Sequence, residues 1–302
     1  DVADWLKYVS GFEDDAKTPA MLTHPITAIS DDGSAVTPEI LDQVLENVKA
    51  SDLYLIEHCE HHDTGAVNEG PVSRELGVPG IPEDTELKIV ARDIEAARRT
   101  GVHVHFQHVS TAISFEAIRK AKAEGLPITC ETAPHYLALS DEALLKYGTL
   151  AKMNPPLRTK EDRQALLEGL KNDVFDVIST DHAPHTMVEK GVSMKSAPFG
   201  IVGLETSVSL TITELVDKGW ITPMQMAEKM SYNPAQILHL TNKGSLKPGK
   251  DADVVVIDPK ESYVIDVKDF ASKGKNTPFQ GKKVNGKVKV TICGGRVVYE
   301  DK

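Results

Sequence analysis

The sequence predicts an α/β fold in which parallel strands alternate with helices, followed by a small β module. From about residue 26 to 240, short apolar runs alternate with amphipathic helical patterns. Several of these runs end abruptly in Asp or His, as strands do where they open onto a polar loop. From Gly244 onward the pattern changes to turns and short strands. We therefore place one domain at 1–240 and a second, small β module at 241–302.

The elements of the first domain follow in order along the chain. The predicted strands are 25–29, 53–56, 102–106, 127–130 and 174–178. The predicted helices are 38–50, 83–99, 114–124, 141–145, 205–217 and 223–230. Strands that alternate with helices favour a parallel sheet that is closed or covered by helices. We count about five βα units, whereas a complete (β/α)8 barrel has eight, so we expect further units upstream of Asp1.

The tail has the composition of a small antiparallel module. Gly244–Lys250 is turn chemistry, Asp253–Ile257 is strand-like, and residues 288–299 read as two short strands around Gly294-Gly295. The fold class that we expect is therefore α/β, with a β-sandwich module completed by residues outside this chain.

Composition excludes several classes of function. The chain of 302 residues has a formal net charge of -11, with 45 acidic against 34 basic residues, and no Lys/Arg-rich run. A nucleic-acid partner is therefore not expected, and no apolar run approaches the roughly 20 residues of a membrane span. The three cysteines are scattered and form no CxxC pair, which favours a reducing, cytoplasmic location.

Four predicted strand ends each deliver a metal-binding side chain. These are Asp31-Asp32, His58, His108 and Asp181. Imidazole and carboxylate groups that converge from different strands suit a divalent metal such as zinc. Each residue alone is weak support, because Asp181 could be a helix N-cap and a single strand-end histidine is often structural. Four at successive strand ends favour a metal site.

The other histidines are expected to be structural. His103 and His105 imitate a metal-binding His-x-His, but they lie partway along a strand, so we expect packing or hydrogen bonding. The loop histidines 61 and 62 are expected to be solvated, and Cys59 to be a buried thiol. His135 could line the cleft, with a structural role equally open.

Six motifs in register resemble class I dihydroorotases, which belong to the amidohydrolase superfamily of metal-dependent TIM barrels. The resemblance covers the chain from about residue 26 and extends into the tail. The motifs are Ser30-Asp31-Asp32-Gly33, His58-Cys59-Glu60, His108-Val109-Ser110-Thr111, Asn154-Pro155-Pro156-Leu157-Arg158, Thr180-Asp181-His182-Ala183-Pro184-His185 and Pro198-Phe199-Gly200-Ile201-Val202-Gly203-Leu204-Glu205.

The resemblance implies a TIM-type (β/α)8 barrel with a site of about two zinc ions. Asp32 would bridge the two ions, with Asp31 as the fallback. His58 and His108 would be ligands of the second metal. Asp181 would be a ligand of the first metal and the general base that serves a metal-bridging hydroxide.

The resemblance also implies the substrate side of the site. Asn154, His185, Phe199 and Gly200 would hold the pyrimidine ring and its carboxylate. The reaction would be the reversible cyclisation of N-carbamoyl-L-aspartate to L-dihydroorotate in pyrimidine biosynthesis. As partners we expect a second copy in a homodimer and, as in some relatives, aspartate transcarbamoylase.

One family motif is absent from the sequence. The His-x-His-x-Arg at the end of the first barrel strand should supply two ligands of the first metal and an arginine for the substrate. We interpret its absence as truncation, in agreement with the strand count. A chain that begins at Asp1 is then expected to bind the first metal poorly and to be nearly inactive.

Two alternative functions stay open at the level of sequence. Allantoinase or hydantoinase would use the same chemistry, although Asn154, His185 and Pro198-Phe199-Gly200 match dihydroorotases better. A non-catalytic, dihydroorotase-like scaffold for aspartate transcarbamoylase is the alternative from a different class. Such scaffolds usually have damaged ligand motifs, and those visible here are undamaged.

Overall fold

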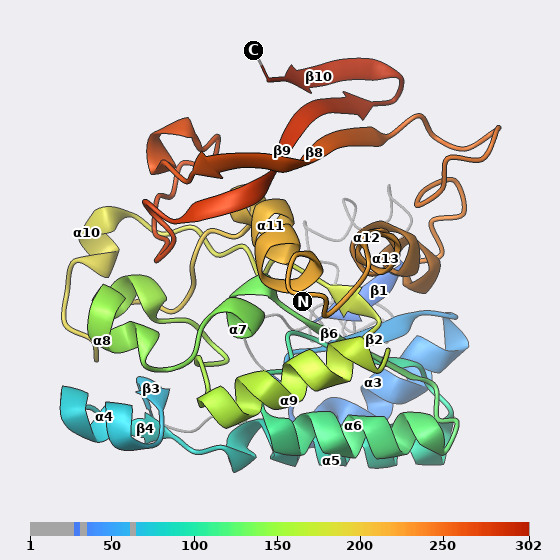
Figure 1. The fold of residues 1–302 in the computed structure, drawn as a ribbon. Coiled ribbons are helices and arrows are strands. Elements are labelled where there is room, and N and C mark those ends of the chain that lie inside the picture. Colours follow the sequence, from blue (N-terminus) through green and yellow to red (C-terminus); the bar gives the residue numbers. More distant parts are fainter. Residues whose placement is uncertain (1–26, 31–34, 61–64, 302) are drawn as a thin grey trace, which may run out of the picture.

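A parallel sheet of five strands forms the centre of the first domain (Figure 1). The computed structural model describes residues 27–30, 35–60 and 65–301. Each strand pairs in parallel with the next one in the order β1-β2-β5-β6-β7. The strands are β1 (Ala28–Ser30), β2 (Tyr54–Glu57), β5 (Val104–Phe106), β6 (Ile128–Thr132) and β7 (Val177–Ile178). The five strands expected from the sequence are therefore confirmed, in the order of a barrel wall.

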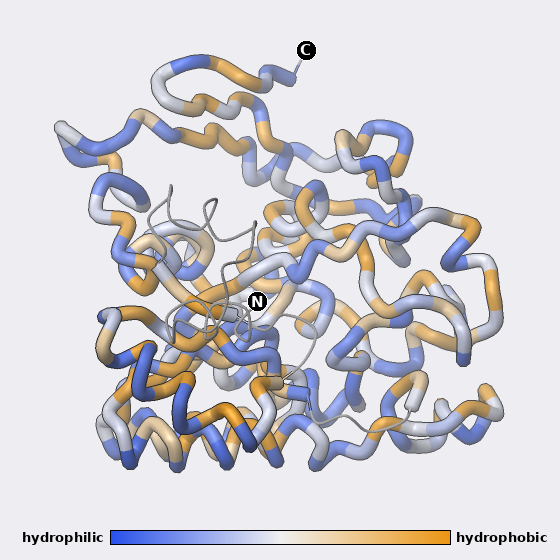
Figure 2. The backbone as a smooth tube through the Cα atoms, turned by 180° about the vertical axis from the view of Figure 1, so that it is seen from behind, coloured by the Kyte–Doolittle hydropathy of each residue, from blue (hydrophilic) through white to orange (hydrophobic). Residues whose placement is uncertain are grey.

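Helices between the strands cover one side of this sheet. The covering helices are α3 (Pro38–Ala50), α5 (Asp84–Thr100), α6 (Ala112–Ala123) and α9 (Lys160–Lys171), and each contacts the next in chain order (Figure 1). In Figure 2 they show alternating polar and apolar turns, as expected for helices with one buried face. In α3 the buried side is Leu41, Val44, Leu45 and Val48.

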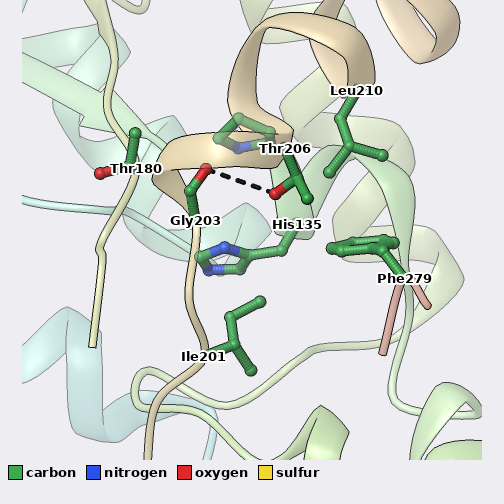
Figure 3. Close-up of a pocket in the computed structure, with 8 residues that line it drawn as sticks. His135, Thr180, Ile201, Gly203, Thr206, Leu210 and Phe279 are labelled. Carbon is green, nitrogen blue, oxygen red and sulfur yellow. Dashed lines mark hydrogen bonds between the residues drawn. The ribbon is translucent and has the colours of Figure 1, made fainter. Parts of the chain in front are cut away.

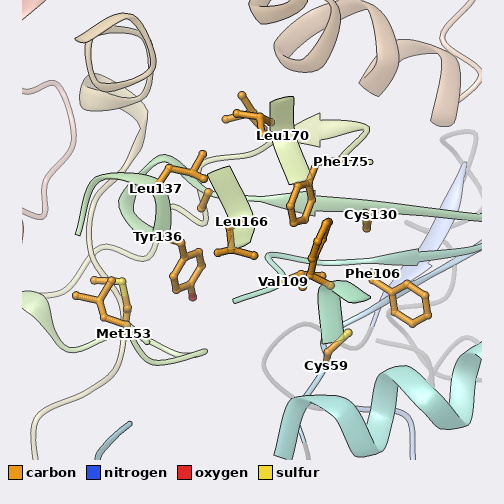
Figure 4. Packing of buried hydrophobic residues seen from close by; sticks show 14 of the residues in the cluster. Cys59, Phe106, Val109, Cys130, Tyr136, Leu137, Met153, Leu166, Leu170 and Phe175 are labelled. Atoms are coloured by element: carbon orange, nitrogen blue, oxygen red, sulfur yellow. The ribbon is translucent and has the colours of Figure 1, made fainter. Parts of the chain in front are cut away.

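Buried apolar side chains fill the space between the sheet and its helices (Figure 4). Phe106 of β5 and Cys130 of β6 are fully buried, and Phe115 of α6 stacks on Phe175 with ring centroids 5.5 Å apart. A second, smaller cluster joins α3 to β1 and β2. This packing holds the strands rigidly, so the loops that follow them have fixed starting points.

Shorter elements follow the strands. After β2 come β3 (Val67–Asn68), α4 (Pro71–Leu76) and β4 (Gly80–Ile81); after β6 come α7 (Pro134–Ala138), α8 (Ala143–Tyr147) and a 3-10 turn, η1 (Gly148–Ala151). After β7 come α10 (Met187–Lys190), α11 (Leu204–Thr211), η2 (Ile212–Val216), α12 (Pro223–Ala227), η3 (Glu228–Tyr232) and α13 (Asn233–Ile237). Within the described residues no helix is long and apolar enough to cross a membrane.

The tail forms an antiparallel sheet in the order β10-β9-β8. Its strands are β8 (Val254–Val264), β9 (Lys283–Cys293) and β10 (Arg296–Glu300), with the 3-10 turn η4 (Val267–Asp269) between the first two. Helix α11 packs against β9 and connects this sheet to the barrel wall (Figure 1). The described residues show a single sheet here, so the expected sandwich and the domain boundary near residue 240 stay predictions.

Candidate metal and substrate site

Two buried imidazoles meet at the ends of β2 and β5. His58 follows β2 directly and His108 lies two residues beyond β5; each is 3% exposed. Their ring centroids are 4.5 Å apart in an edge-to-face arrangement. Because the two strands are neighbours, two residues far apart in the sequence become adjacent at one end of the sheet.

Glu86 of α5 fixes the loop that follows His108. Its carboxylate accepts four hydrogen bonds at 2.5–3.0 Å, from the backbone amides and the hydroxyls of Ser110 and Thr111. Arg158 donates to the Ser110 hydroxyl at 3.1 Å. The backbone of His108 itself has φ of 31°, an uncommon conformation for a residue other than glycine. The surrounding hydrogen bonds therefore hold the loop backbone next to His108 in place.

His108, one of the expected ligands, has the chemistry that a divalent metal needs. Among the described residues, neither ring nitrogen of His108 has a hydrogen-bond partner, although both are buried. Buried polar atoms normally have partners, so an orphaned imidazole needs an explanation such as an ion. Burial, and then the neighbouring His58 and His135, hold the pKa of His108 well below its usual value. The ring is therefore neutral, which is the form that binds metals.

Asp181 stands at the end of β7 beside His135. The His135 Nε2 lies 3.9 Å from an Asp181 carboxylate oxygen, and Asp181 has φ of 46°. Burial lowers the pKa of His135 to about 3, so its ring is neutral at pH 7. His135 projects into a small cavity of about 10 Å³, room for about one water molecule. Thr180, Ile201, Gly203 and Phe279 are among the residues around it (Figure 3).

Glu131 of β6 connects the two loops that hold His108 and Asp181. One carboxylate oxygen accepts from the backbone amide of His108 at 3.3 Å and from the Ser179 hydroxyl at 2.7 Å. The other lies 3.2 Å from the His105 Nε2. A single side chain thus sets the relative position of the ends of β5 and β7.

Asn154 lies close to the imidazole pair through Glu60. The amide nitrogen of Asn154 donates to the Glu60 carboxylate, and the same carboxylate oxygen is 3.9 Å from the Nδ1 of His58. Asn154 precedes a cis proline, Pro155. The Asn154 segment therefore reaches the same end of the sheet as the metal candidates.

His185, Phe199 and Gly200 form a second group. The His185 Nε2 is hydrogen-bonded to the Phe199 carbonyl oxygen at 2.7 Å. The Asn276 carboxamide accepts from the His185 amide at 2.9 Å and donates to the Gly200 carbonyl at 3.0 Å. Gly200 has φ of 115°, and a Cβ there would collide with the Cβ of Ala183, so only glycine fits.

The structure brings some of the candidates from the sequence together. His58 and His108 lie in contact at the ends of neighbouring strands, and Asn154 reaches His58 through Glu60. Asp181 follows β7, which β6 separates from β5, and it lies beside His135. Asp31 and Asp32, and the loop histidines 61 and 62, lie outside the described residues. Within residues 27–30, 35–60 and 65–301, no group of three or more His, Cys, Asp or Glu side chains is arranged so that it could hold a metal ion. The assignment of metal ligands therefore stays a prediction.

The structural residues were predicted correctly. His103 and His105 both bond to the hydroxyl of Thr129, at 2.9 and 2.8 Å, so these two histidines are hydrogen-bonded as expected. Cys59 is a buried free thiol, and burial raises its pKa well above the usual value.

Sequence reasoning missed the carboxylates and amides that support the site. Glu86, Glu131 and Asn276 have no metal-binding pattern, and their partners are distant in the sequence. One signal was available, because Thr129 and Glu131 alternate along β6 and place two polar groups on the same face of the strand. Two polar residues on one face of a strand in a parallel sheet indicate a functional or supporting role.

A parallel α/β sheet with histidines and a carboxylate at its strand ends is typical of metal-dependent hydrolases. Comparison with known proteins points to the same class. The model of the Amidohydrolase family matches residues 6–298. The chain therefore belongs to the amidohydrolase family, as the motifs predicted.

Within this family, the chain is similar to curated dihydroorotases. The chain is 47% identical over 279 residues to a dihydroorotase from Acetivibrio thermocellus and 49% identical over 279 residues to one from Pelotomaculum thermopropionicum. Each match covers 91% of this chain and 65% of the relative. The chain thus spans about two thirds of the length of these relatives.

Solved structures confirm the fold. A D-hydantoinase (dihydropyrimidinase) from Thermus sp. superimposes with a TM-score of 0.82 at 26% identity, covering 95% of this chain and 68% of that one. An L-hydantoinase (dihydropyrimidinase) from Arthrobacter aurescens gives 0.79 at 27% identity, covering 91% and 63%.

Proposed function

We propose that the protein is a dihydroorotase, which reversibly cyclises N-carbamoyl-L-aspartate to L-dihydroorotate in de novo pyrimidine biosynthesis. The observation that carries the proposal is the 47–49% identity to curated dihydroorotases along 91% of this chain. The undamaged His58, His108 and Asp181 motifs support a catalytic protein over a scaffold. The three free cysteines support a cytoplasmic location.

The site would hold zinc, in about two ions per complete site. His58, His108, Asp181 and Asp32 are the proposed ligands. The buried, partnerless ring nitrogens of His108 support this assignment. When bound, the metal would supply a lowered pKa for water and a polarised substrate carbonyl.

Asp181 would act as the general base and acid. In hydrolysis it would take a proton from the attacking water and return it to the ring nitrogen that leaves as the amide bond breaks. Asp181 has a positive φ, and the Glu131–Ser179 hydrogen bond two residues earlier holds the backbone that leads to it. In the biosynthetic direction the same proton movements run in reverse.

Asn154, His185, Phe199 and Gly200 would bind the ring and its carboxylate. The carbonyl oxygens of Phe199 and Gly200 are hydrogen-bonded to His185 and Asn276, respectively. A cyclic amide has donors and acceptors on its edge, so a rigid backbone edge can recognise it. As partners we propose a second copy of the chain and aspartate transcarbamoylase.

Hydantoinase is the second candidate, favoured by the similarity of fold to solved hydantoinases. Turnover distinguishes the two candidates. We expect kcat/KM for L-dihydroorotate to exceed that for hydantoin and for allantoin by roughly 100-fold or more. The assay uses zinc-loaded protein in which any residues that precede Asp1 are retained. Preference for hydantoin would establish the second candidate, and metal binding without any turnover would favour the scaffold.

Asp181→Asn tests the role of the proposed base. Loss of the proton-transfer group is expected to lower kcat by about 10²–10⁴, measured with dihydroorotate. The matched control is Asp52→Asn, because Asp52 is an exposed aspartate that also has a positive φ, 53°. Equal activity of Asp181→Asn and Asp52→Asn would remove Asp181 from the mechanism.

A further inference from the structure

Lys190, at the end of α10, is a buried lysine without a carboxylate partner among the described residues. It is 1% exposed. Its ammonium donates to three backbone carbonyls, those of Lys152 at 3.0 Å, Pro198 at 2.8 Å and Gly200 at 3.0 Å. An ammonium has three donors, and here all three are used.

These three carbonyls belong to the two segments that carry the proposed substrate residues. Pro198 and Gly200 flank Phe199, and Lys152 lies two residues before Asn154. The Gly200 amide also donates to the Lys152 carbonyl at 3.0 Å. Lys190 therefore joins the Asn154 segment to the 198–200 segment through one nitrogen atom.

The 198–200 segment is held at each of its carbonyls. Lys190 donates to the carbonyls of Pro198 and Gly200. His185 is hydrogen-bonded to the Phe199 carbonyl, and Asn276 donates a second hydrogen bond to the Gly200 carbonyl. Lys152 supports the residues just before it, since its ammonium donates to the Ala197 carbonyl at 2.6 Å and lies 4.3 Å from the centroid of the Phe199 ring. The geometry leaves this segment little freedom before any ligand arrives.

We propose that Lys190 is a positioning residue, whose ammonium preorganises the Pro198–Gly200 segment against the Asn154 segment for binding of a cyclic amide. This inference rests on the proposed function of the site. Fixing these segments in advance lowers the entropy that ligand binding would otherwise cost. The role belongs to binding, because Lys190 is buried behind the segment and contacts its carbonyls.

The three hydrogen bonds of the Lys190 ammonium depend on pH, because they depend on the charge of the side chain. Burial and the neighbouring Lys152 ammonium lower the pKa of Lys190 to about 8. Within the described part of the chain, no carboxylate forms an ion pair with Lys190 or Lys152. The other titratable side chains on the segments around Lys190 are His185, Glu189 and Lys195. A neutral amine has only two donors, so one of the three carbonyls loses its bond above that pKa.

The first test is hydrogen–deuterium exchange of the wild-type protein, Lys190→Met and Lys195→Met. Lys195 is the matched control, because it is an exposed lysine of the same loop. We expect the Gly200 amide to exchange roughly tenfold faster in Lys190→Met and unchanged in Lys195→Met. Unchanged exchange in folded Lys190→Met would overturn the proposal.

The second test separates positioning from a merely structural role. Loss of preorganisation should raise the KM of Lys190→Met for dihydroorotate roughly tenfold and change kcat less than about threefold. The wild-type KM should rise as pH increases through about 8 and converge on that of Lys190→Met. Parallel KM profiles of the two proteins, or an unchanged KM, would contradict the proposal.

Failure of the proposed role of Lys190 and failure of the proposed function give different results. If Lys190→Met fails to fold, the pH profile of the wild-type KM decides, and a KM that stays flat from pH 7 to about 9 overturns the inference. If the wild-type protein turns over hydantoin and no dihydroorotate, the proposed function fails. The exchange measurement and the KM for hydantoin then still test Lys190.

Discussion

Single buried carboxylates decide where the metal candidates lie. Glu86 is 1% exposed and receives four hydrogen bonds from the loop after His108. Glu86 lies on α5, which precedes β5 in the chain. Its hydrogen bonds therefore connect the start of this helix to the loop that follows β5. Metal-binding residues can be predicted from residue type at strand ends, whereas Glu86 depends on a tertiary contact that no local pattern reveals.

Glu86→Ala should destabilise the protein. Removing the carboxylate leaves the buried amides of Ser110 and Thr111 without partners, at a cost of about 2–4 kcal/mol in the free energy of unfolding. Urea denaturation measures this free energy. Glu95→Ala on the same helix is the control, because the exposed Glu95–Arg98 pair contributes at most about 1 kcal/mol. A loss below about 1 kcal/mol for Glu86→Ala would contradict the account.

Among single residues, the candidate ligands could be proposed from the sequence, whereas the residues that hydrogen-bond to the surrounding loops could not. His58, His108 and Asp181 could be proposed as ligands because imidazole and carboxylate groups follow successive apolar runs, and that assignment stays a prediction. Glu131 and Asn276 were missed because their partners come from other strands or from the tail. The burial of Lys190 is visible only in the structure, because its three partners are backbone carbonyls.

At the scale of elements, amphipathic patterns were a reliable guide to helices. The predicted ends of α3 match the observed ones, and those of α5 and α6 differ by one or two residues. Helix α9 was missed, although Thr159 and Asp162 form a capping box at its start. The helix predicted at 205–217 is α11 continued by the π-helical turn η2. Side-chain periodicity does not reveal this change in hydrogen bonding.

The inner face of β5 and β6 makes stability depend on pH. Burial, and then the charge of His105, lower the pKa of His103 to about 4, from 6.5 for a free histidine. Between these two values the unfolded chain binds a proton that the folded protein does not, so stability falls as pH falls from 6.5 to 4. The contribution of His103 is roughly 2 kcal/mol after allowance for partial exposure to solvent.

His103→Gln isolates this contribution. The variant should lose less stability than the wild-type protein between pH 6.5 and 4, as measured by urea denaturation at each pH. His239→Gln is the control, because His239 also contacts the Tyr54 ring but is exposed. Identical pH profiles for His103→Gln and the wild type would refute the assignment.

At the scale of the whole molecule, the parallel wall and the antiparallel tail sheet were both predictable. Alternating patterns indicated the five strands, and the turn at Gly294-Gly295 indicated the hairpin of β9 and β10. The length of β8 and β9 was underestimated, because their exposed valines and polar residues give a weaker signal than a buried strand. The packing of α11 on β9 could not be predicted, since it joins segments distant in sequence.

We propose that metal bound by the residues that follow β2, β5 and β7 enables turnover of a cyclic amide. The most direct measurement is dihydroorotate turnover by chelator-treated protein, with any residues that precede Asp1 retained, as zinc is added back. We predict that activity is lost on chelation and returns in proportion to bound zinc, up to about two ions per chain. Activity that survives removal of the metal, or full zinc binding without turnover, would contradict the claim.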